Sequence, residues 1–255
     1  MGLIDKKQVE RKFTKALSKY DNNAIAQQQI NLRLIELLKN NGKLDFSTVL
    51  EIGCGTGLFT QLLREHISSK NWIFNDICDV RANLEKLFLG DIFEFHLSDA
   101  EHWDFAKRSY DLISSASVIQ WFNDPCFFIQ RITRHLNSQG ILLLSTFSQE
   151  NLKEIRRLTG IGLDYPSLDD WQQWLDADYE IVYLAQQEIC LSFLSPSDVL
   201  KHLKNTGVTG IKQHYWSKYN LKTFITDYEK MYKLESGKVG LTYSPILILA
   251  IKKEK

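Results

Sequence analysis

Hydrophobic residues recur at helical spacing near the start of the chain. From Val9 to Leu38 they follow at steps of three or four, with a polar gap in the middle. This spacing places them on one face of a helix. The polar segment NNGKLD, which begins at Asn40, ends the pattern. We therefore expect residues 1–40 to form a helical N-terminal cap.

Short apolar runs then alternate with helical segments from Thr48 onward. The apolar runs are TVLEIG, WIFND, FEFHLSD, YDLISSA and ILLLSTF, and the helical segments span residues 58–66, 80–87 and 127–136. Strands separated by helices are typical of βαβ units, which form a parallel sheet covered on both faces. Residues 48–147 are therefore predicted to form one α/β core.

The second half of the chain has a different pattern. The segment SLDDWQQWL predicts a short helix with Ser167 as its N-cap. The strand-like runs near 180–193 and 243–253 are expected to pair antiparallel at one edge of the sheet. Two further helices, from Ser197 and from Asn220, lie between those runs. Residues 195–238 would then form a helical lid insertion in a single domain of residues 1–255.

Composition favours a folded soluble protein. Hydrophobic residues make up 44% and charged residues 24% of 255 residues, close to the average for globular proteins. The N-terminus lacks a secretory signal, and the longest apolar run, Ile246–Ile251, is too short to span a bilayer, so we expect a cytoplasmic protein. The four cysteines and six histidines show no metal-ligand spacing, which predicts free thiols and no metal site.

The formal net charge of zero hides an uneven distribution. Residues 1–39 carry a net +4 and residues 201–238 a net +5, whereas residues 40–200 carry −11. Two explanations remain open: solvated helix faces, or a docking surface for an acidic partner. Neither a continuous basic stripe over the domain nor an N-P-P-Y motif is present, so we expect no nucleic-acid partner.

A glycine-rich loop follows the first predicted strand of the core. In VLEIGCGTG the glycines are Gly53, Gly55 and Gly57, and Leu58 stands where a dinucleotide-binding fingerprint has its third glycine. A nicotinamide oxidoreductase is therefore disfavoured. The G-x-G-x-G spacing after Glu51 resembles motif I of class I S-adenosylmethionine-dependent methyltransferases. The resemblance implies a Rossmann-like sheet, mainly parallel with an antiparallel edge strand, and S-adenosylmethionine as the cofactor.

Further acids follow at the intervals which that family shows. Glu51 would face the ammonium of the cofactor, Asp76 its ribose hydroxyls, and Asp99 its adenine. As alternatives, Asp76 only caps a helix, Asp99 is a turn acid, and Cys54 is a small loop residue without a catalytic role. The cofactor-binding residues that the resemblance implies are Tyr20, Gln27, Glu51, Gly53, Gly55, Gly57, Asp76, Asp99, Ala100 and Ser115.

A second resemblance extends over almost the whole chain. The segments VERKFTKALSKYDNNAIAQQQ, SASVIQW, STFSQENLKEI, LKNTGVTG and GLTYSP are similar to landmarks of the malonyl-acyl-carrier-protein O-methyltransferases of biotin synthesis. The sequence departs from them at Ser244, where many relatives have His, and in FTKAL at residues 13–17.

This resemblance implies methylation of the free carboxylate of a malonyl thioester, on acyl carrier protein or coenzyme A. A carboxylate is ionised at neutral pH and needs no base, and no Tyr/His pair is evident in the sequence. A buried anion needs a partner, so Arg156 and Lys204 are candidate cations. The candidate substrate-orienting residues are Tyr20, Gln120, Arg156 and Lys204.

Acyl carrier protein is acidic, so the basic flanks gain a second interpretation as its docking surface, with Lys212, Lys218 and Lys222 as test positions. The protein is expected to be a monomer without a membrane partner. Two alternatives remain open: a methyltransferase of another small acid or small molecule, and a cofactor-binding protein without transfer activity.

Overall fold

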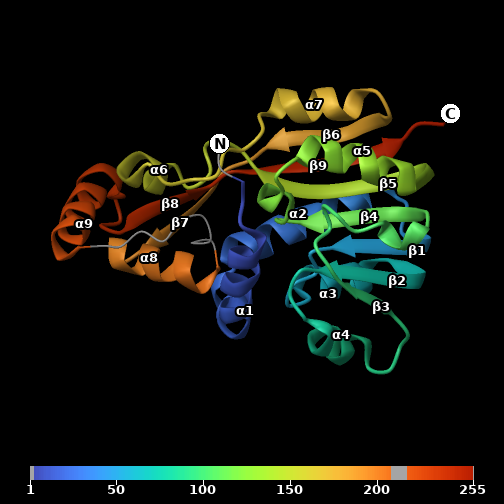
Figure 1. The fold of residues 1–255 in the computed structure, drawn as a ribbon. Helices are drawn as coiled ribbons and strands as arrows, with labels where there is room; N and C mark the ends of the chain where they lie inside the picture. Colours follow the sequence, from blue (N-terminus) through green and yellow to red (C-terminus); the bar gives the residue numbers. More distant parts are fainter. Residues whose placement is uncertain (1–2, 208–216, 255) are drawn as a thin grey trace.

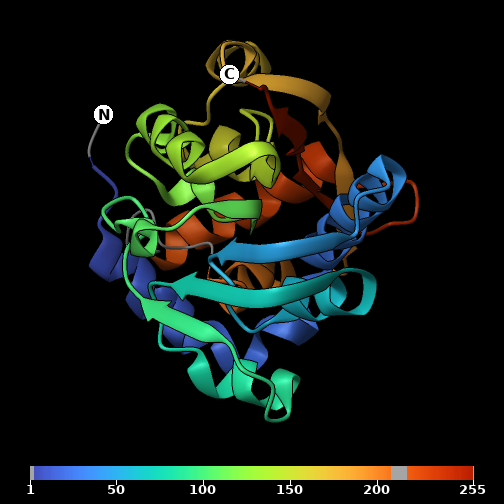
Figure 2. The ribbon, with the colours of Figure 1, turned by 90° about the vertical axis from the view of Figure 1, so that its right-hand side faces the viewer.

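A seven-stranded sheet forms the centre of the computed structural model, which describes residues 3–207 and 217–254 (Figure 1). The strand order is β3-β2-β1-β4-β5-β9-β6. The strands are β1 (Asp45–Ile52), β2 (Ser68–Asp76), β3 (Glu94–Leu97), β4 (Tyr110–Ala116), β5 (Leu136–Phe147), β6 (Tyr179–Gln186) and β9 (Pro245–Lys252). The strands twist progressively across the sheet (Figure 2).

The first five strands run parallel, as the alternation of strands and helices predicts. Strand β9 pairs antiparallel with both β5 and β6 and thereby attaches β6 at the edge. The antiparallel pairing expected between the runs near 180–193 and 243–253 is confirmed. The carboxyl ends of β1, β2 and β4 meet on one side, where the strand order reverses between β1 and β4. Ligands of open α/β sheets bind at this position.

Helices cover both faces of the sheet because its strands are apolar on both sides. Leu112 and Leu143 pack into one core cluster, and their neighbours Ile113 and Leu144 into the other. The first face carries α2 (Ile25–Asn41), α3 (Leu58–His66) and α4 (Arg81–Phe88), and the second carries α5 (Pro125–His135) and α7 (Leu168–Asp176). Helix α7 begins at a capping box in which Ser167 and Asp170 bond each other's backbone, as predicted for Ser167.

The N-terminal helical segment is two helices, not one. Helix α1 (Lys6–Asn23) ends at Ala24, whose ψ of 43° interrupts the helix before α2 begins. Neither Gly nor Pro marks this break, so the periodicity alone did not reveal it. The change of direction lets α2 pack on the sheet while α1 crosses its carboxyl edge (Figure 1). The end of α2 at Gly42, with φ of 85°, agrees with the sequence.

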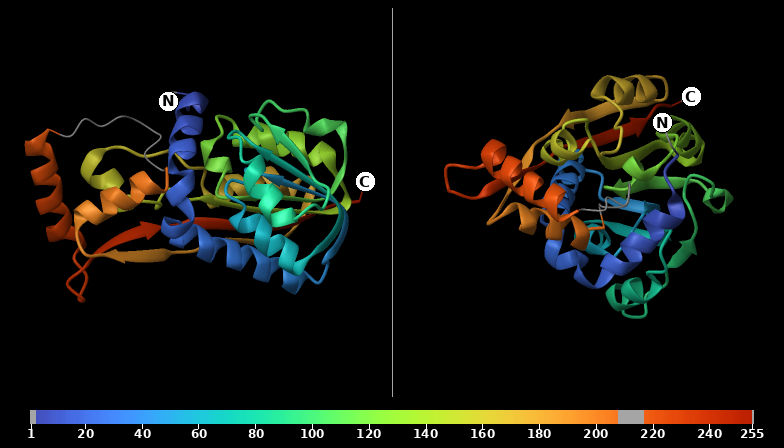
Figure 3. Two further views of the ribbon diagram at one scale, coloured as in Figure 1. Left: turned by 90° about the horizontal axis from the view of Figure 1, so that it is seen from below. Right: turned by 60° about the vertical axis from the view of Figure 1, so that its left-hand side comes forward.

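The antiparallel pairing between the segments near 180–193 and 243–253 continues beyond the main sheet. Strands β7 (Ile189–Phe193) and β8 (Val239–Tyr243) form a two-stranded sheet of their own. Helices α6 (Lys153–Thr159), α8 (Pro196–Asn205) and α9 (Lys218–Tyr232) lie around it. Helix α1 crosses between this outlying part and the main sheet (Figure 3). The sequence had not predicted α6. The last three residues of the segment LKNTGVTG, residues 208–210, lie outside the described residues.

Among the described residues, no helix is long and apolar enough to cross a bilayer. The same residues contain no group of three or more side chains placed to hold a metal ion.

Candidate active site

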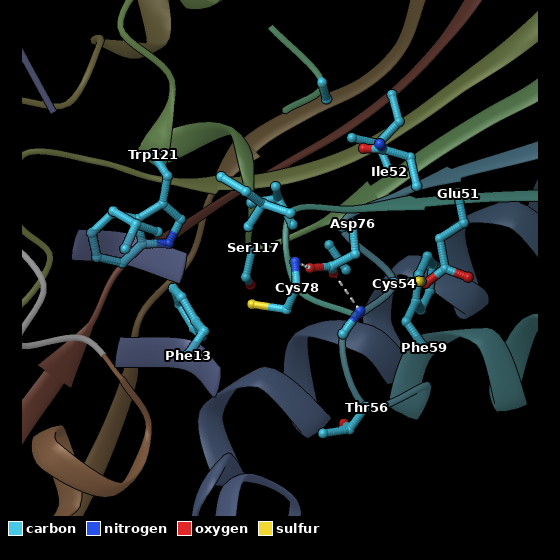
Figure 4. Close-up of a pocket in the computed structure, with 18 of the residues that line it drawn as sticks. Phe13, Glu51, Ile52, Cys54, Thr56, Phe59, Asp76, Cys78, Ser117 and Trp121 are labelled. Atoms are coloured by element: carbon cyan, nitrogen blue, oxygen red, sulfur yellow. Dashed lines mark hydrogen bonds between the residues drawn. The ribbon is translucent and has the colours of Figure 1, made fainter. Parts of the chain in front are cut away.

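A cavity of about 130 Å³ opens at the carboxyl ends of the parallel strands, beneath α1. The loop after β1 supplies Gly53, the end of β2 supplies Asp76, and the loop after β4 supplies Ser117. Phe13 of α1 packs edge-on against Trp121 with 5.5 Å between ring centroids and closes the opposite side (Figure 4). Side chains from distant parts of the sequence therefore enclose one site.

The glycine loop has a conformation that other residues rarely adopt. Gly53, Gly55 and Gly57 have φ of 70°, 55° and 92°. A Cβ atom on Gly53 would lie 2.3 Å from a methyl of Val118, and one on Gly57 would lie 2.5 Å from a methyl of Leu87. These two glycines are thus required both by backbone conformation and by close packing. Gly55 is open to the cavity and brings its backbone close to any ligand there.

Asp76 fixes the loop from the end of β2. One carboxylate oxygen accepts the Gly55 N–H at 2.8 Å and the other accepts the Cys78 N–H at 2.7 Å (Figure 4). Burial raises the pKa of Asp76, and these backbone hydrogen bonds oppose the shift. Each oxygen retains a second lone pair, so the carboxylate can still accept hydrogen bonds from a ligand.

Glu51 is buried at the end of β1, with 1% of its surface exposed. Thr60 donates to its carboxylate at 2.8 Å. Burial, opposed by that hydrogen bond, raises the pKa of Glu51 to about 8. The carboxylate also lines the cavity, where a ligand cation would favour its ionised form.

The pKa of Glu51 predicts a pH-dependent stability for the ligand-free protein. Because the folded carboxyl keeps a proton that the unfolded chain releases, unfolding free energy should fall as pH rises from about 4.5 to about 8. Glu51→Gln should flatten this dependence. Urea unfolding at about pH 5, 6.5 and 8, values that span this range, measures the pH dependence of the unfolding free energy. An unchanged slope in the variant would contradict the assignment.

The turn after β3 joins α1 to the cavity. Asp99 and Ala100 line the cavity, and the Asp99 side chain accepts the Glu101 N–H at 3.1 Å. Lys6 of α1 forms ion pairs with Glu101 at 2.6 Å and with Asp99 at 3.6 Å. The N-terminal end of α1 is thereby held over this turn.

A second, smaller cavity of about 20 Å³ adjoins the first and shares Phe13, Tyr20, Gln27, Ser117 and Trp121 with it. Tyr20 and Gln27 therefore belong to the walls of both cavities. Gln120 lines only the second cavity and donates to the Ser117 carbonyl at 2.5 Å.

A buried His–Tyr pair that the sequence had not revealed stands at the second cavity. His202 of α8 lies 2.8 Å from the hydroxyl of Tyr243, measured from its Nε2 atom. Tyr243 lines the cavity, and both residues are buried. The two are 41 residues apart. Tyr243 lay in the LTY landmark, but nothing in the sequence pointed to His202 as its partner.

Several buried polar atoms on the cavity walls have no partner within the described chain. They include Gln27 Oε1, Asn31 Oδ1, Thr56 Oγ1, Ser117 Oγ, Gln120 Oε1 and Trp121 Nε1. Buried polar groups are almost always hydrogen-bonded, so these atoms are available to a polar ligand or to water in the two cavities. The thiols of Cys54 and Cys78 also line the first cavity, but burial raises the pKa of both, which keeps them protonated.

Three predicted site residues lie elsewhere. Lys204 is exposed on α8 and lines neither cavity. Arg156 lies behind the wall: its guanidinium bonds the Leu163 carbonyl and sits 5.8 Å from the Tyr165 ring centroid. Ser115 points into the sheet, where its hydroxyl donates to the Ile52 carbonyl at 3.0 Å. Strand alternation turns Ser115 away, and Ala116 and Ser117 line the cavity instead.

Comparison with known proteins adds to this geometry. A family model described as a methyltransferase domain matches residues 22–213. Malonyl-[acyl-carrier protein] O-methyltransferase of Haemophilus influenzae is 44% identical over 97% of this chain and 95% of its own length. The chain belongs to this methyltransferase family. The enzyme of the same name from Porphyromonas gingivalis is 41% identical over 97% of this chain and 96% of its own.

Solved structures of methyltransferases have the same fold. The N-methyltransferase NodS of Bradyrhizobium japonicum, in complex with S-adenosyl-L-homocysteine, covers 97% of the chain and is itself covered to 100%, with a TM-score of 0.59 and 16% identity. A putative methyltransferase of Bacillus halodurans covers 87% of the chain and is covered to 99%, with a TM-score of 0.61 and 17% identity. The predicted class I methyltransferase architecture is confirmed.

Proposed function

We propose that this protein transfers a methyl group from S-adenosylmethionine to the free carboxylate of a malonyl thioester on acyl carrier protein. The resulting methyl ester would prime pimeloyl synthesis for biotin. The observation that carries the proposal is the near full-length identity to malonyl-[acyl-carrier protein] O-methyltransferases. The two adjoining cavities share part of their walls, so residues between them could contact a donor and an acceptor together.

The residues of the first cavity suit S-adenosylmethionine. Asp76 has free lone pairs for ribose hydroxyls, and the ionised form of Glu51 suits an ammonium. No side chain caps the N-terminus of α3, so its backbone N–H groups are available to a carboxylate. When bound, S-adenosylmethionine supplies its methyl carbon: the bond to sulfur breaks, its electron pair stays on sulfur, and the acceptor oxygen bonds the carbon.

The chain's own residues have limited tasks in this reaction. A carboxylate acceptor is already ionised at neutral pH, so no base is required. Positioning two reactants in line and excluding water are therefore the main contributions. Phe13 and Trp121 close the site from α1 and the loop after β4. Tyr20 and Gln27 line both cavities. These two residues are therefore proposed to orient donor and acceptor together.

Complementation separates this function from its alternatives. The gene should restore growth without biotin to a strain that lacks malonyl-[acyl-carrier protein] O-methyltransferase. Failure despite soluble expression would favour a methyltransferase of another small acid. Cofactor binding without a methylated product from any malonyl thioester or free diacid would favour a binding protein without transfer activity.

We also propose a docking surface for the acidic carrier on α1. Lys7, Arg11, Lys15 and Lys19 are exposed and follow one another at intervals of four residues. No described residue forms an ion pair with any of the four. Like charges at this spacing destabilise a helix, so a role in binding an acidic partner accounts for them better than folding does. The opposite face of α1 covers the cavities.

Charge reversal tests this surface. Changing Lys7, Arg11, Lys15 and Lys19 to Glu should lower kcat/KM for malonyl carrier protein at least about tenfold at low salt, because rim charges steer association. Malonyl-pantetheine, which has no protein part, should react normally. Lys39→Glu and Lys70→Glu, far from the carboxyl edge of the sheet, serve as controls. Equal loss with both substrates would contradict docking on α1.

Other expectations remain predictions. Residues 195–238 are proposed as the lid or substrate insertion, since His202 of α8 contacts Tyr243, which lines the second cavity. Of the lysines suggested there for carrier docking, Lys218 and Lys222 are exposed on α9. Lys212 lies outside the described residues. Sedimentation tests the expected monomer, and fractionation tests the expected cytoplasmic location.

A further inference from the structure

The polar groups on the wall of the second cavity carry no formal charge. They are hydroxyls, amides and one indole; no Lys, Arg, His, Asp or Glu of the described chain lines this cavity. The cations suggested by the sequence, Arg156 and Lys204, are not on the wall. A carboxylate bound in this cavity would therefore meet neutral hydrogen-bond donors.

Three tyrosines from separate elements converge on this cavity. They are Tyr20 of α1, Tyr165 of the segment before α7, and Tyr243 of β8. Burial raises the pKa of all three, that of Tyr165 to about 12, so each keeps its hydroxyl proton at neutral pH. Tyr165 already accepts from the amide nitrogen of Asn151 at 3.0 Å, which leaves its own proton for a ligand.

Tyr243 is held in place by a neutral imidazole. Burial lowers the pKa of His202 to about 4, so the ring is uncharged at neutral pH. Its Nε2 atom contacts the Tyr243 hydroxyl at 2.8 Å, and Phe193 packs against the ring with 5.0 Å between centroids. In the tautomer that carries its proton on Nε2, the imidazole donates to the Tyr243 oxygen, leaves the hydroxyl proton for a ligand and brings no positive charge to the cavity.

We propose that the second cavity binds the acceptor carboxylate through neutral donors, chiefly the hydroxyls of Tyr165 and Tyr243. The unpaired indole N–H of Trp121 adds a third donor. His202 is a positioning residue that acts through Tyr243. This inference rests on the proposed function, because it names how the malonyl carboxylate is held.

Neutral donors suit methyl transfer to a carboxylate. The anionic acceptor and the sulfonium donor lose their charges as the new bond forms, so a full ion pair with Arg or Lys would stabilise the reactants more than the transition state. Only interactions that are stronger in the transition state than in the ground state accelerate the chemical step, and neutral donors favour the charged reactants less than an ion pair would. Hydrogen bonds from hydroxyls still compensate part of the cost of burying the anion and leave its oxygens nucleophilic.

Substitution of the two tyrosines tests the proposal. Tyr243→Phe and Tyr165→Phe should each raise the KM for malonyl-pantetheine about tenfold or more, as expected for the loss of a hydrogen bond to a charged group. The Kd for S-adenosyl-L-homocysteine, measured by calorimetry, should stay within about twofold. Tyr179→Phe is the matched control: Tyr179 is also buried and hydrogen-bonded, to Thr133 at 2.7 Å, but it lies on β6 and lines neither cavity.

Two further measurements separate a positioning role of His202 and a specific role of the tyrosines from a general loss of structure. His202→Gln can still bond Tyr243 and should keep most activity, whereas His202→Leu should resemble Tyr243→Phe. Acetyl-pantetheine lacks the carboxylate, so its inhibition constant should be the same for the wild type and the tyrosine variants.

The outcomes that would overturn the proposal are distinct. Tyrosine variants that behave like Tyr179→Phe, or that weaken acetyl-pantetheine as much as malonyl-pantetheine, would overturn it while the proposed function stands. A wild-type protein that forms no methyl ester on any malonyl thioester would overturn the proposed function and this inference with it.

Discussion

Gly53→Ala should weaken binding of S-adenosylmethionine at least about 30-fold. The added methyl would lie 2.3 Å from Val118 at a residue with φ of 70°, so either the loop or the cavity wall must move. Left-handed backbone costs a non-glycine residue about 1–2 kcal/mol, and overpacking adds about 1–3 kcal/mol. Each 1.4 kcal/mol corresponds to about a factor of ten in affinity.

Gly42→Ala is the matched control for that variant. Gly42 also has a positive φ, 85°, but a Cβ there meets no atom within 4 Å. This change should lower the melting temperature slightly and leave cofactor affinity unchanged. Calorimetric titration of both variants measures the difference. Normal cofactor binding by a folded Gly53→Ala protein would contradict the role of the loop.

Asp76→Asn should weaken cofactor binding by about 100-fold. The carboxylate accepts two backbone N–H groups, from Gly55 and Cys78. An amide has only one oxygen, so one buried donor would face the NH2 group at a cost of about 1–3 kcal/mol. The loss of an ionised acceptor for the ribose hydroxyls adds to this.

Asp111→Asn separates binding from folding. Asp111 also uses both carboxylate oxygens: one accepts the N–H groups of Ser47 and Thr48, both at 2.9 Å, and the other accepts the Asn137 amide at 2.7 Å, so an amide at residue 111 would leave one of these donors unpaired. It lies at the start of β4, at the opposite end of the sheet from the cavities. The Asp111 variant should therefore lose stability without losing cofactor affinity. Equal affinities for the two variants would show that Asp76 is only a structural cap.

The fold and the donor side of the site could be predicted from local sequence patterns. Short apolar runs that alternate with helical segments predicted the strands and helices of the core, and the three loop glycines have the positive φ that glycine favours. The antiparallel pairing was predicted from the two strand-like runs near residues 180–193 and 243–253. The break at Ala24 could not be predicted, because tertiary packing of α1 and α2 in different directions causes it, with no helix-breaking residue.

The acceptor side depends on contacts between residues far apart in the chain. His202 and Tyr243 meet only because the outlying sheet and α8 pack together, and no local motif encodes that contact. The expected cation is not on the cavity wall for a related reason. Arg156 was predicted to bind the carboxylate, but its side chain turns to the Leu163 carbonyl behind Tyr165. Side-chain direction of this kind is set by packing, which residue type alone does not reveal.

Incubation of the purified protein with malonyl carrier protein and methyl-labelled S-adenosylmethionine tests the central claim most directly. We predict that mass spectrometry of the carrier will show one added methyl group, located on the malonyl carboxylate as an ester and absent with acetyl carrier protein. A methylated product only from free diacids, or no transfer by a protein that binds the cofactor, would contradict the account.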